Sequence, residues 1–207
     1  MPTTPDSFAA VYLGEVGDIV RSLDPAAVED LALALADVRR RRGRLFVLGV
    51  GGGAAHASHA VNDFRKLCGF EAYAPTDNVA ELTARTNDEG WESSFDAWLR
   101  TSRISSQDAI LIFSVGGGSR THNVSVNLVR AVELAREVGA RVFGVVGRAD
   151  GATAEAADVC IVVDAPPERR TPHVEEFQAI VWHLLVSHPA LLTAAAKWES
   201  VEAAEGR

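Results

Sequence analysis

The sequence predicts an α/β fold in which helices cover both faces of a mostly parallel sheet. Short, continuous apolar runs, such as 44–49 and 109–114, are typical of strands buried in a parallel sheet. Stretches with helical spacing of apolar residues separate these runs, and strands that alternate with helices require crossover connections. Two glycine-rich turns directly follow predicted strands, at the edge where open parallel sheets bind ligands. Because no internal repeat or linker divides the 207 residues, we expect a single domain.

Two amphipathic helices are expected before the first strand. Apolar residues recur at helical spacing over 5–23. Asp24 and Pro25 then provide the N-cap and the first residue of a second helix, which is expected to run to about Arg42 and to end at Gly43. Because such helices need a partner surface, they should cover the domain's own sheet or pair with another subunit.

The core is expected over 44–192, after a helical extension over 1–43. Its strands are predicted at 44–49, 109–114, 141–146 and 159–163, with a weaker one near 71–74. Its helices are predicted at 54–66, 92–101, 124–138 and 175–192. This order predicts a three-layer αβα sandwich with a five-stranded sheet in the middle.

The acidic composition argues against general nucleic-acid binding, which depends on lysine and arginine. The net charge is −8 and the isoelectric point is about 5.2. The arginine-rich run 39–44 is interpreted as cations at a helix C-terminus. No apolar run approaches the ~18 residues that span a bilayer, and no signal peptide is visible. Cys68 and Cys160 have no disulfide or metal spacing, so we expect a cytoplasmic protein that binds neither nucleic acid nor membranes.

The two glycine-rich turns, 49–53 and 114–119, favour an anion-binding site. Each follows a strand and leads toward a helix, whose N-terminus presents backbone N–H groups and a positive dipole end. Two such turns in one sheet favour phosphate binding, although neither has the pattern of a nucleotide P-loop. Ala54 stands at the third glycine of a dinucleotide motif and Glu71 follows about twenty positions later, so a dinucleotide-binding fold remains an alternative.

Histidines and carboxylates share faces on two predicted helices. His59 and Asp63 have i,i+4 spacing. Glu176 and His183 lie nearly two turns apart on one face, and Glu175 lies about 80° from His183 around the helix. Each pair alone is more often a surface feature than a site. If the two helices meet, these side chains are suited to bind a divalent metal or to act as acid and base.

The chain resembles the sugar isomerase (SIS) domain proteins, and specifically the bacterial phosphoheptose isomerases, over about 45–185. The resemblance rests on GVGGG at 49–53, HAVND at 59–63, TND at 86–88, FSVGGGS at 113–119 and VEEFQAIVWH at 174–183. The corresponding family stretches read roughly GNGGS, HxxxE, GND, STSGNS and QEIHxxxxH. The resemblance implies the SIS fold and a tetramer built around the N-terminal helices, with active sites at subunit interfaces.

The resemblance also implies a metal site and a catalytic pair. A zinc-like ion is expected on His59, Asp63, Glu175 and His183, with Asp63 and His183 as the catalytic residues. Asp63 replaces the family's glutamate and is one methylene shorter, and Glu175 replaces a glutamine and adds a negative charge. The implied substrate-binding residues are Gly51, Gly52, Gly53, Asp88, Ser114, Gly116, Gly117, Ser119, Arg120 and Glu175.

The predicted phosphate end departs further from the family pattern. Gly53, Val115 and Gly116 stand where the family has hydroxyl side chains. A segment of about six residues, 120–125, is added after the second turn, and Arg120 is expected to offer the phosphate a positive charge.

These residues suit aldose–ketose isomerisation of a sedoheptulose 7-phosphate-like sugar phosphate through an enediol. That reaction needs one group that moves a carbon-bound proton and another that serves an oxygen. The alternative is a non-catalytic SIS protein that binds a sugar phosphate or acts as an adaptor. The shorter carboxylate of Asp63 and the lost hydroxyls favour this alternative, whereas the four candidate metal ligands oppose it.

Overall fold

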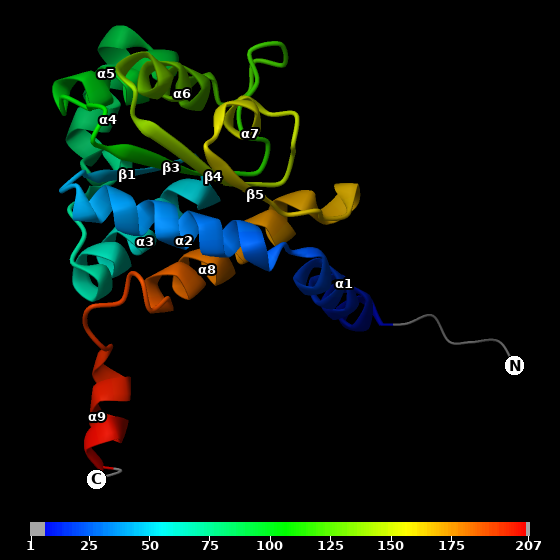
Figure 1. Ribbon diagram of the computed structural model, residues 1–207. Coiled ribbons are helices and arrows are strands. Elements are labelled where there is room, and N and C mark those ends of the chain that lie inside the picture. Colours follow the sequence, from blue (N-terminus) through cyan, green and yellow to red (C-terminus); the bar gives the residue numbers. More distant parts are fainter. Residues whose placement is uncertain (1–6, 206–207) are drawn as a thin grey trace, which may run out of the picture.

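A five-stranded, all-parallel sheet lies between two layers of helices in the computed structural model, which describes residues 7–205 (Figure 1). The strand order is β2-β1-β3-β4-β5. The strands are β1 (Leu45–Gly49), β2 (Ala72–Tyr73), β3 (Ala109–Ser114), β4 (Arg141–Val146) and β5 (Val159–Val162). This arrangement confirms the predicted three-layer fold, including the weak strand near 71–74.

The alternation of side chains along each strand divides the core into two halves. Leu45 and Val47 of β1 pack on one side of the sheet, whereas Phe46 and Leu48 pack on the other. The first side is covered by α2 (Pro25–Arg40), α3 (Gly52–Cys68) and α8 (Arg170–Ser187), and the second by α5 (Ser94–Thr101) and α6 (Val126–Val138). Both faces are therefore buried, which explains the continuous apolar runs in the sequence.

The first two helices differ in what they pack against: one covers the sheet of its own domain and the other does not. Helix α2 lies against the sheet and buries its apolar residues, as Figure 1 shows. Helix α1 (Phe8–Ser22) extends away from the core, and within it only Ile19 is buried. Phe8, Leu13 and Val20 of α1 are each more than half exposed. Covering the sheet thus falls to α2, and α1 carries an uncovered apolar surface.

Within the described residues 7–205, three α-helices were not predicted: α4 (Val79–Glu89), α7 (Ala152–Ala156) and α9 (Lys197–Glu205). Helix α4 buries none of its residues and consists mostly of polar residues, so its apolar pattern is weak. Its start is instead marked by Asn78, whose side chain accepts a hydrogen bond from the backbone N–H of Glu81 at 3.2 Å. The helix predicted over 92–101 is present as α5, which begins two residues later than predicted.

The predicted end of the second helix was wrong in its detail. Helix α2 ends at Arg40, and the residue with left-handed backbone is Arg42, with φ 61°. The N–H of Gly43 then donates to the Val38 carbonyl at 2.9 Å. Gly43 is required for another reason: a Cβ atom there would lie 2.8 Å from the carbonyl carbon of Gln107.

The arginine-rich run is used in internal contacts. Arg39 donates to the carbonyl oxygens of Cys68, Leu191 and Ala190, at 2.6, 2.5 and 3.0 Å. It thereby fastens the end of α3 to the segment that follows α8. Arg44 pairs with Asp108 at 2.8 Å.

Within residues 7–205, no helix is both long enough and apolar enough to cross a membrane.

Candidate functional site

Three of the predicted site residues meet between α3 and α8. The Oδ2 atom of Asp63 lies 3.5 Å from Nε2 of His59 and 3.7 Å from Nε2 of His183. One potential ligand atom from each residue lies within 4.8 Å of the other two. We call these three residues the histidine–aspartate cluster. The sequence predicted a site only on the condition that the two helices meet. In the structure, α3 and α8 do bring these side chains together.

Asp63 is held in place by neighbours that the sequence analysis did not identify. Its side chain is 12% exposed. Trp182 donates from Nε1 to Oδ2 at 3.2 Å, and Asn62 donates from Nδ2 to Oδ1 at 2.9 Å. The Trp182 ring also packs against both histidines of the cluster, with ring centroids 5.2 and 4.7 Å away. In the sequence, the only indication of a role for Trp182 is its position next to His183.

The hydrogen bonding of His183 indicates which ring nitrogen faces the cluster as an acceptor. Its Nδ1 lies 2.8 Å from the carbonyl oxygen of Ala179, which only accepts, so Nδ1 carries a proton. In the neutral ring, Nε2 then presents a lone pair toward the carboxylate of Asp63. Two electron-rich atoms face each other favourably only with a proton or a cation between them. A carbonyl behind the ring is also the usual support of a metal-binding histidine.

A cavity of about 350 Å³ opens beside the histidine–aspartate cluster. Its far wall is the segment after α8, which contributes Leu192, Ala195, Ala196 and Glu199. This segment is fastened to the end of α3, because Thr193 donates from its backbone N–H to the Leu67 carbonyl at 2.8 Å. The predicted core ended at 192, so most of this wall was not predicted from the sequence.

Glu175 lies apart from the cluster, at the other end of the two helices. A Cβ atom on Gly52 would lie 2.5 Å from its carboxyl carbon, so the Glu175 side chain sits directly against the N-terminus of α3. His183 lies eight positions after Glu175, which corresponds to about 12 Å of helix. Glu176 points elsewhere and accepts a hydrogen bond from Tyr12, which raises the pKa of Tyr12 to about 12.

The two glycine turns meet at a second cavity, of about 140 Å³, which we call the glycine-turn cavity. It is lined by Val50, Gly53, Ser114, Val115, Gly116, Val124, Ser125, Glu175 and Gln178. The Ser114 hydroxyl accepts a hydrogen bond from the Gly117 N–H at 3.0 Å and so shapes the second turn. Gly51 and Gly117 have positive φ angles of 61° and 72°, which explains why glycine occupies both positions.

Six of the predicted substrate-binding residues line neither of these two cavities: Gly51, Gly52, Asp88, Gly117, Ser119 and Arg120. Asp88 is exposed on α4 and accepts a hydrogen bond from Asn87. Arg120 pairs with Glu133 of α6, donating from Nε at 3.0 Å, and lines neither the glycine-turn cavity nor the cavity beside the cluster. Ser119 lies just beyond the glycine-turn cavity.

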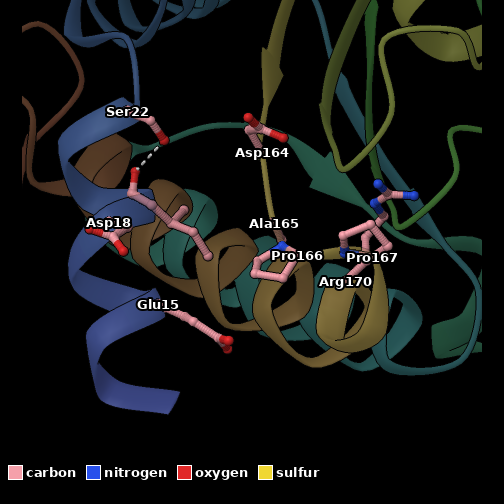
Figure 2. Close-up of a pocket in the computed structure, with 9 residues that line it drawn as sticks. Glu15, Asp18, Ser22, Asp164, Ala165, Pro166, Pro167 and Arg170 are labelled. Atoms are coloured by element: carbon pink, nitrogen blue, oxygen red, sulfur yellow. Dashed lines mark hydrogen bonds between the residues drawn. The ribbon is translucent and has the colours of Figure 1, made fainter. Parts of the chain in front are cut away.

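A further cavity, of about 400 Å³, separates α1 from the segment between β5 and α8 (Figure 2). Glu15, Asp18 and Ser22 of α1 face Asp164 and Arg170 across it. None of the predicted site residues lines this cavity, so it is not part of the candidate site.

Cys68 is not a candidate ligand. Burial raises the pKa of its thiol to about 11, so it stays protonated at neutral pH. Cys68 is fully buried in the core.

Comparisons with known proteins agree with the geometry. The SIS domain family model matches residues 11–147. The lincomycin biosynthesis protein LmbN of Streptomyces lincolnensis is 34% identical over 197 residues, covering 89% of this chain and 70% of LmbN. The phosphoheptose isomerase of Rhodospirillum rubrum is 31% identical over 166 residues, covering 78% of this chain and 82% of that enzyme.

The fold agrees with that of a solved enzyme. The structure of phosphoheptose isomerase GmhA from Neisseria gonorrhoeae superposes with a TM-score of 0.75 at 24% identity, covering 86% of this chain and 95% of that one. Together with the family match and the relatives above, this shows that the chain belongs to the SIS domain family and that it is similar to the phosphoheptose isomerases.

Proposed function

We propose that the protein is a sugar-phosphate isomerase that interconverts an aldose and a ketose of the sedoheptulose 7-phosphate type through an enediol. One observation carries the proposal: His59, Asp63 and His183 converge at a cavity in a chain similar to phosphoheptose isomerases. A buried carboxylate beside two imidazoles supplies the general base and general acid that proton transfer between neighbouring carbons requires.

The Asp63 carboxylate is the proposed base for the carbon-bound proton. The Asp63 side chain is shorter than a glutamate, but hydrogen bonds from Trp182 and Asn62 hold both of its carboxylate oxygens in position. His183 serves the substrate oxygen through Nε2, because its Nδ1 is engaged with a backbone carbonyl. Reaction geometry set in advance in this way lowers the entropic cost of the transition state.

The residues of the cluster also fit a divalent ion. Two imidazoles and one carboxylate are a common zinc donor set, and three protein ligands leave a position open for substrate. Such an ion would supply stabilisation of the negative charge on the enediolate oxygens. Because His183 has a single free ring nitrogen, that atom holds either the ion or a proton at any moment. Glu175, outside the cluster, is assigned to the sugar chain.

The phosphate of the substrate is proposed to bind at the end of the site marked by the second glycine turn. Ser114 and Ser119 remain there as hydroxyl donors, although the turn has lost others. Binding energy at this remote end holds the reacting carbons in position at the cluster. The similarity to LmbN, which is named for a biosynthetic role, widens the candidate substrates to related long-chain sugar phosphates.

Solvent exchange tests the proposal directly. The zinc-loaded protein is incubated in D₂O with a panel of C6 to C8 ketose phosphates, including sedoheptulose 7-phosphate, and the products are analysed by mass spectrometry. An isomerase yields aldose phosphate with one solvent deuterium at the carbon that gains the proton. If every sugar returns unlabelled and unconverted, while sugar phosphate still binds, the non-catalytic SIS reading replaces the proposal.

A further inference from the structure

A buried amide joins α8 to α3 on the glycine-turn side of the histidine–aspartate cluster. Gln178 of α8 is completely buried. Its Oε1 lies 3.0 Å from Nδ1 of His56 on α3, and because an amide oxygen only accepts, His56 is the donor. His56 stands three residues before His59, and Gln178 stands five residues before His183. The pair therefore connects the two helices about one turn away from the cluster.

The other end of this amide has no partner. Among residues 7–205, no group accepts a hydrogen bond from Nε2 of Gln178, although that atom is buried. Buried amides are normally hydrogen-bonded, because a buried donor without a partner loses the hydrogen bonds that it makes in water. Gln178 also lines the glycine-turn cavity. Its N–H donors are therefore available to a molecule that binds in that cavity.

Glu175 lines the same cavity, one helical turn before Gln178. Residues three apart on a helix have Cβ atoms about 5–6 Å apart, so these two side chains form neighbouring parts of the wall. A carboxylate only accepts hydrogen bonds, whereas the NH₂ group of an amide only donates them. If the amide were reversed, its oxygen would join the carboxylate as a second acceptor, which disfavours that arrangement.

A hydroxyl group matches this pair of side chains. Its oxygen accepts one hydrogen bond and its proton is donated in another, so it can bind Nε2 of Gln178 and the carboxylate of Glu175 together. An apolar carbon in the same place would leave both polar groups unpaired, which is costly away from water. A polyhydroxy chain is the class of ligand that offers such hydroxyls on successive carbons.

Both residues depart from the family pattern. The phosphoheptose isomerase stretch that reads roughly QEIHxxxxH has glutamine and histidine where this chain has Glu175 and Gln178. The first change introduces a group that only accepts, and the second replaces an imidazole with an amide. Because the two departures fall on one cavity, we expect them to act on the same part of the ligand.

We propose that Gln178 is a specificity-determining residue, which together with Glu175 binds one hydroxyl group in the middle of the sugar chain. This inference deepens the proposed function and rests on it for the identity of the sugar. With the reacting carbons at the cluster and the phosphate at the second glycine turn, the hydroxyl belongs to a carbon between them. His56 holds the amide in the orientation that offers its donor.

The first experiment uses the parent protein and needs no substitution. Isothermal titration calorimetry measures the Kd of the full-length protein for sedoheptulose 7-phosphate and for its 3-, 4-, 5- and 6-deoxy analogues. Removal of the hydroxyl that Gln178 and Glu175 bind leaves both groups unpaired, so one analogue should bind about tenfold more weakly. If all four analogues bind as tightly as the complete sugar, the proposal is wrong.

The second experiment removes the donor. Gln178→Met keeps a side chain of similar length without an N–H group, and it should raise the Kd of sedoheptulose 7-phosphate about tenfold. The variant should also lose the preference for the complete sugar over the weakened analogue. The Kd of inorganic phosphate should not change, because that ligand has no hydroxyl-bearing chain to place beside Gln178. Equal weakening of both ligands, or an unchanged preference, would overturn the specificity role.

Asn127→Leu is the matched control. Asn127 of α6 is also completely buried, and its Nδ2 atom also has no hydrogen-bond partner within residues 7–205. It lines neither the glycine-turn cavity nor the cavity beside the cluster. This variant should leave every Kd unchanged, and circular dichroism shows whether both variants are folded.

The outcomes separate this inference from the proposed function. Deuterium exchange by the parent, with Gln178→Met binding the sugar phosphate as tightly as Asn127→Leu does, overturns the inference alone. Loss of the preference in Gln178→Met, without deuterium exchange by the parent on any sugar, upholds the hydroxyl contact and overturns the isomerase. A parent protein that binds none of the sugar phosphates overturns both.

Discussion

The two ends of the candidate site are built from different kinds of structure. At the cluster end, the functional side chains stand within α3 and α8, and the buried Trp182 ring packs against both histidines. At the phosphate end, they stand on the glycine turns, next to the added segment 120–125. The cluster end keeps close to the family pattern, whereas the phosphate end departs from it. The difference is what we expect if the proposed reaction is that of the family and the binding of the phosphate end has changed.

The largest expected effect comes from the acid–base pair at the cluster end. Asp63→Asn and His183→Ala should each lower kcat by about 100-fold or more, because each removes a positioned proton-transfer group. Asp77→Asn, an exposed carboxylate that bonds Ser58 on another face of α3, is the control for the charge change. Asp63→Glu restores the family's residue and should retain or raise activity on heptose phosphates. If Asp63→Asn turns over as fast as the parent, Asp63 is not the base.

A second test asks whether the cluster holds a metal. The purified protein should carry one divalent ion per chain, most readily zinc, and His59→Ala should lower this content and the affinity for added zinc. Elemental analysis and competition with a zinc-binding dye provide the measurement. A parent protein without bound metal, whose activity also survives a strong chelator, would contradict the metal assignment.

A smaller effect tests how the cluster end is supported. Trp182→Phe keeps an aromatic ring but removes the N–H that donates to Oδ2 of Asp63. The carboxylate then loses one of its two supports, and kcat should fall about tenfold while KM changes little. Steady-state kinetics separates the two constants. A change confined to KM would mean that Trp182 contacts substrate and does not position Asp63.

The oligomeric state tests the surface left by α1. Phe8, Leu13 and Val20 expose much of their apolar area, and such a surface is suited to bury against other subunits. We predict a tetramer, which light scattering would report as four times the 22.1 kDa chain mass. Leu13→Glu should weaken the assembly. A stable monomer for the parent protein would refute the role given to residues 1–43.

The smallest effect concerns acid stability at the contact between α1 and the start of α8. Hydrogen bonds from Arg169 and His173 hold the pKa of Glu15 at about 2, below its ordinary value of 4.5, and fasten α1 to the start of α8. Because the folded-state pKa is the lower one, this stabilisation is complete above pH 4.5 and is lost as the pH falls toward 2. Thermal unfolding between pH 5 and 3 should show a weaker pH dependence in Glu15→Gln. An identical dependence in the two proteins would contradict the assignment.

The same contrast explains what the sequence could predict. His59 and Asp63 were recognisable because i,i+4 spacing on one helix brings them together wherever that helix packs. The strands were recognisable because both faces of the sheet are buried. The direction of Glu175 could not be predicted, since the face that a helical residue presents to a second helix depends on the packing of the pair.

The segment after α8 has a practical consequence for any metal measurement. Ala195, Ala196 and Glu199 line the cavity beside the histidine–aspartate cluster, and α9 begins within this wall. A polyhistidine tag fused after Arg207 would therefore be tethered to the same short helix. Its imidazoles would bind metal near the histidine–aspartate cluster, and a metal assay would count that metal together with the metal held by the cluster. Protein for zinc determination should carry its tag at the other terminus, or have it removed by proteolysis.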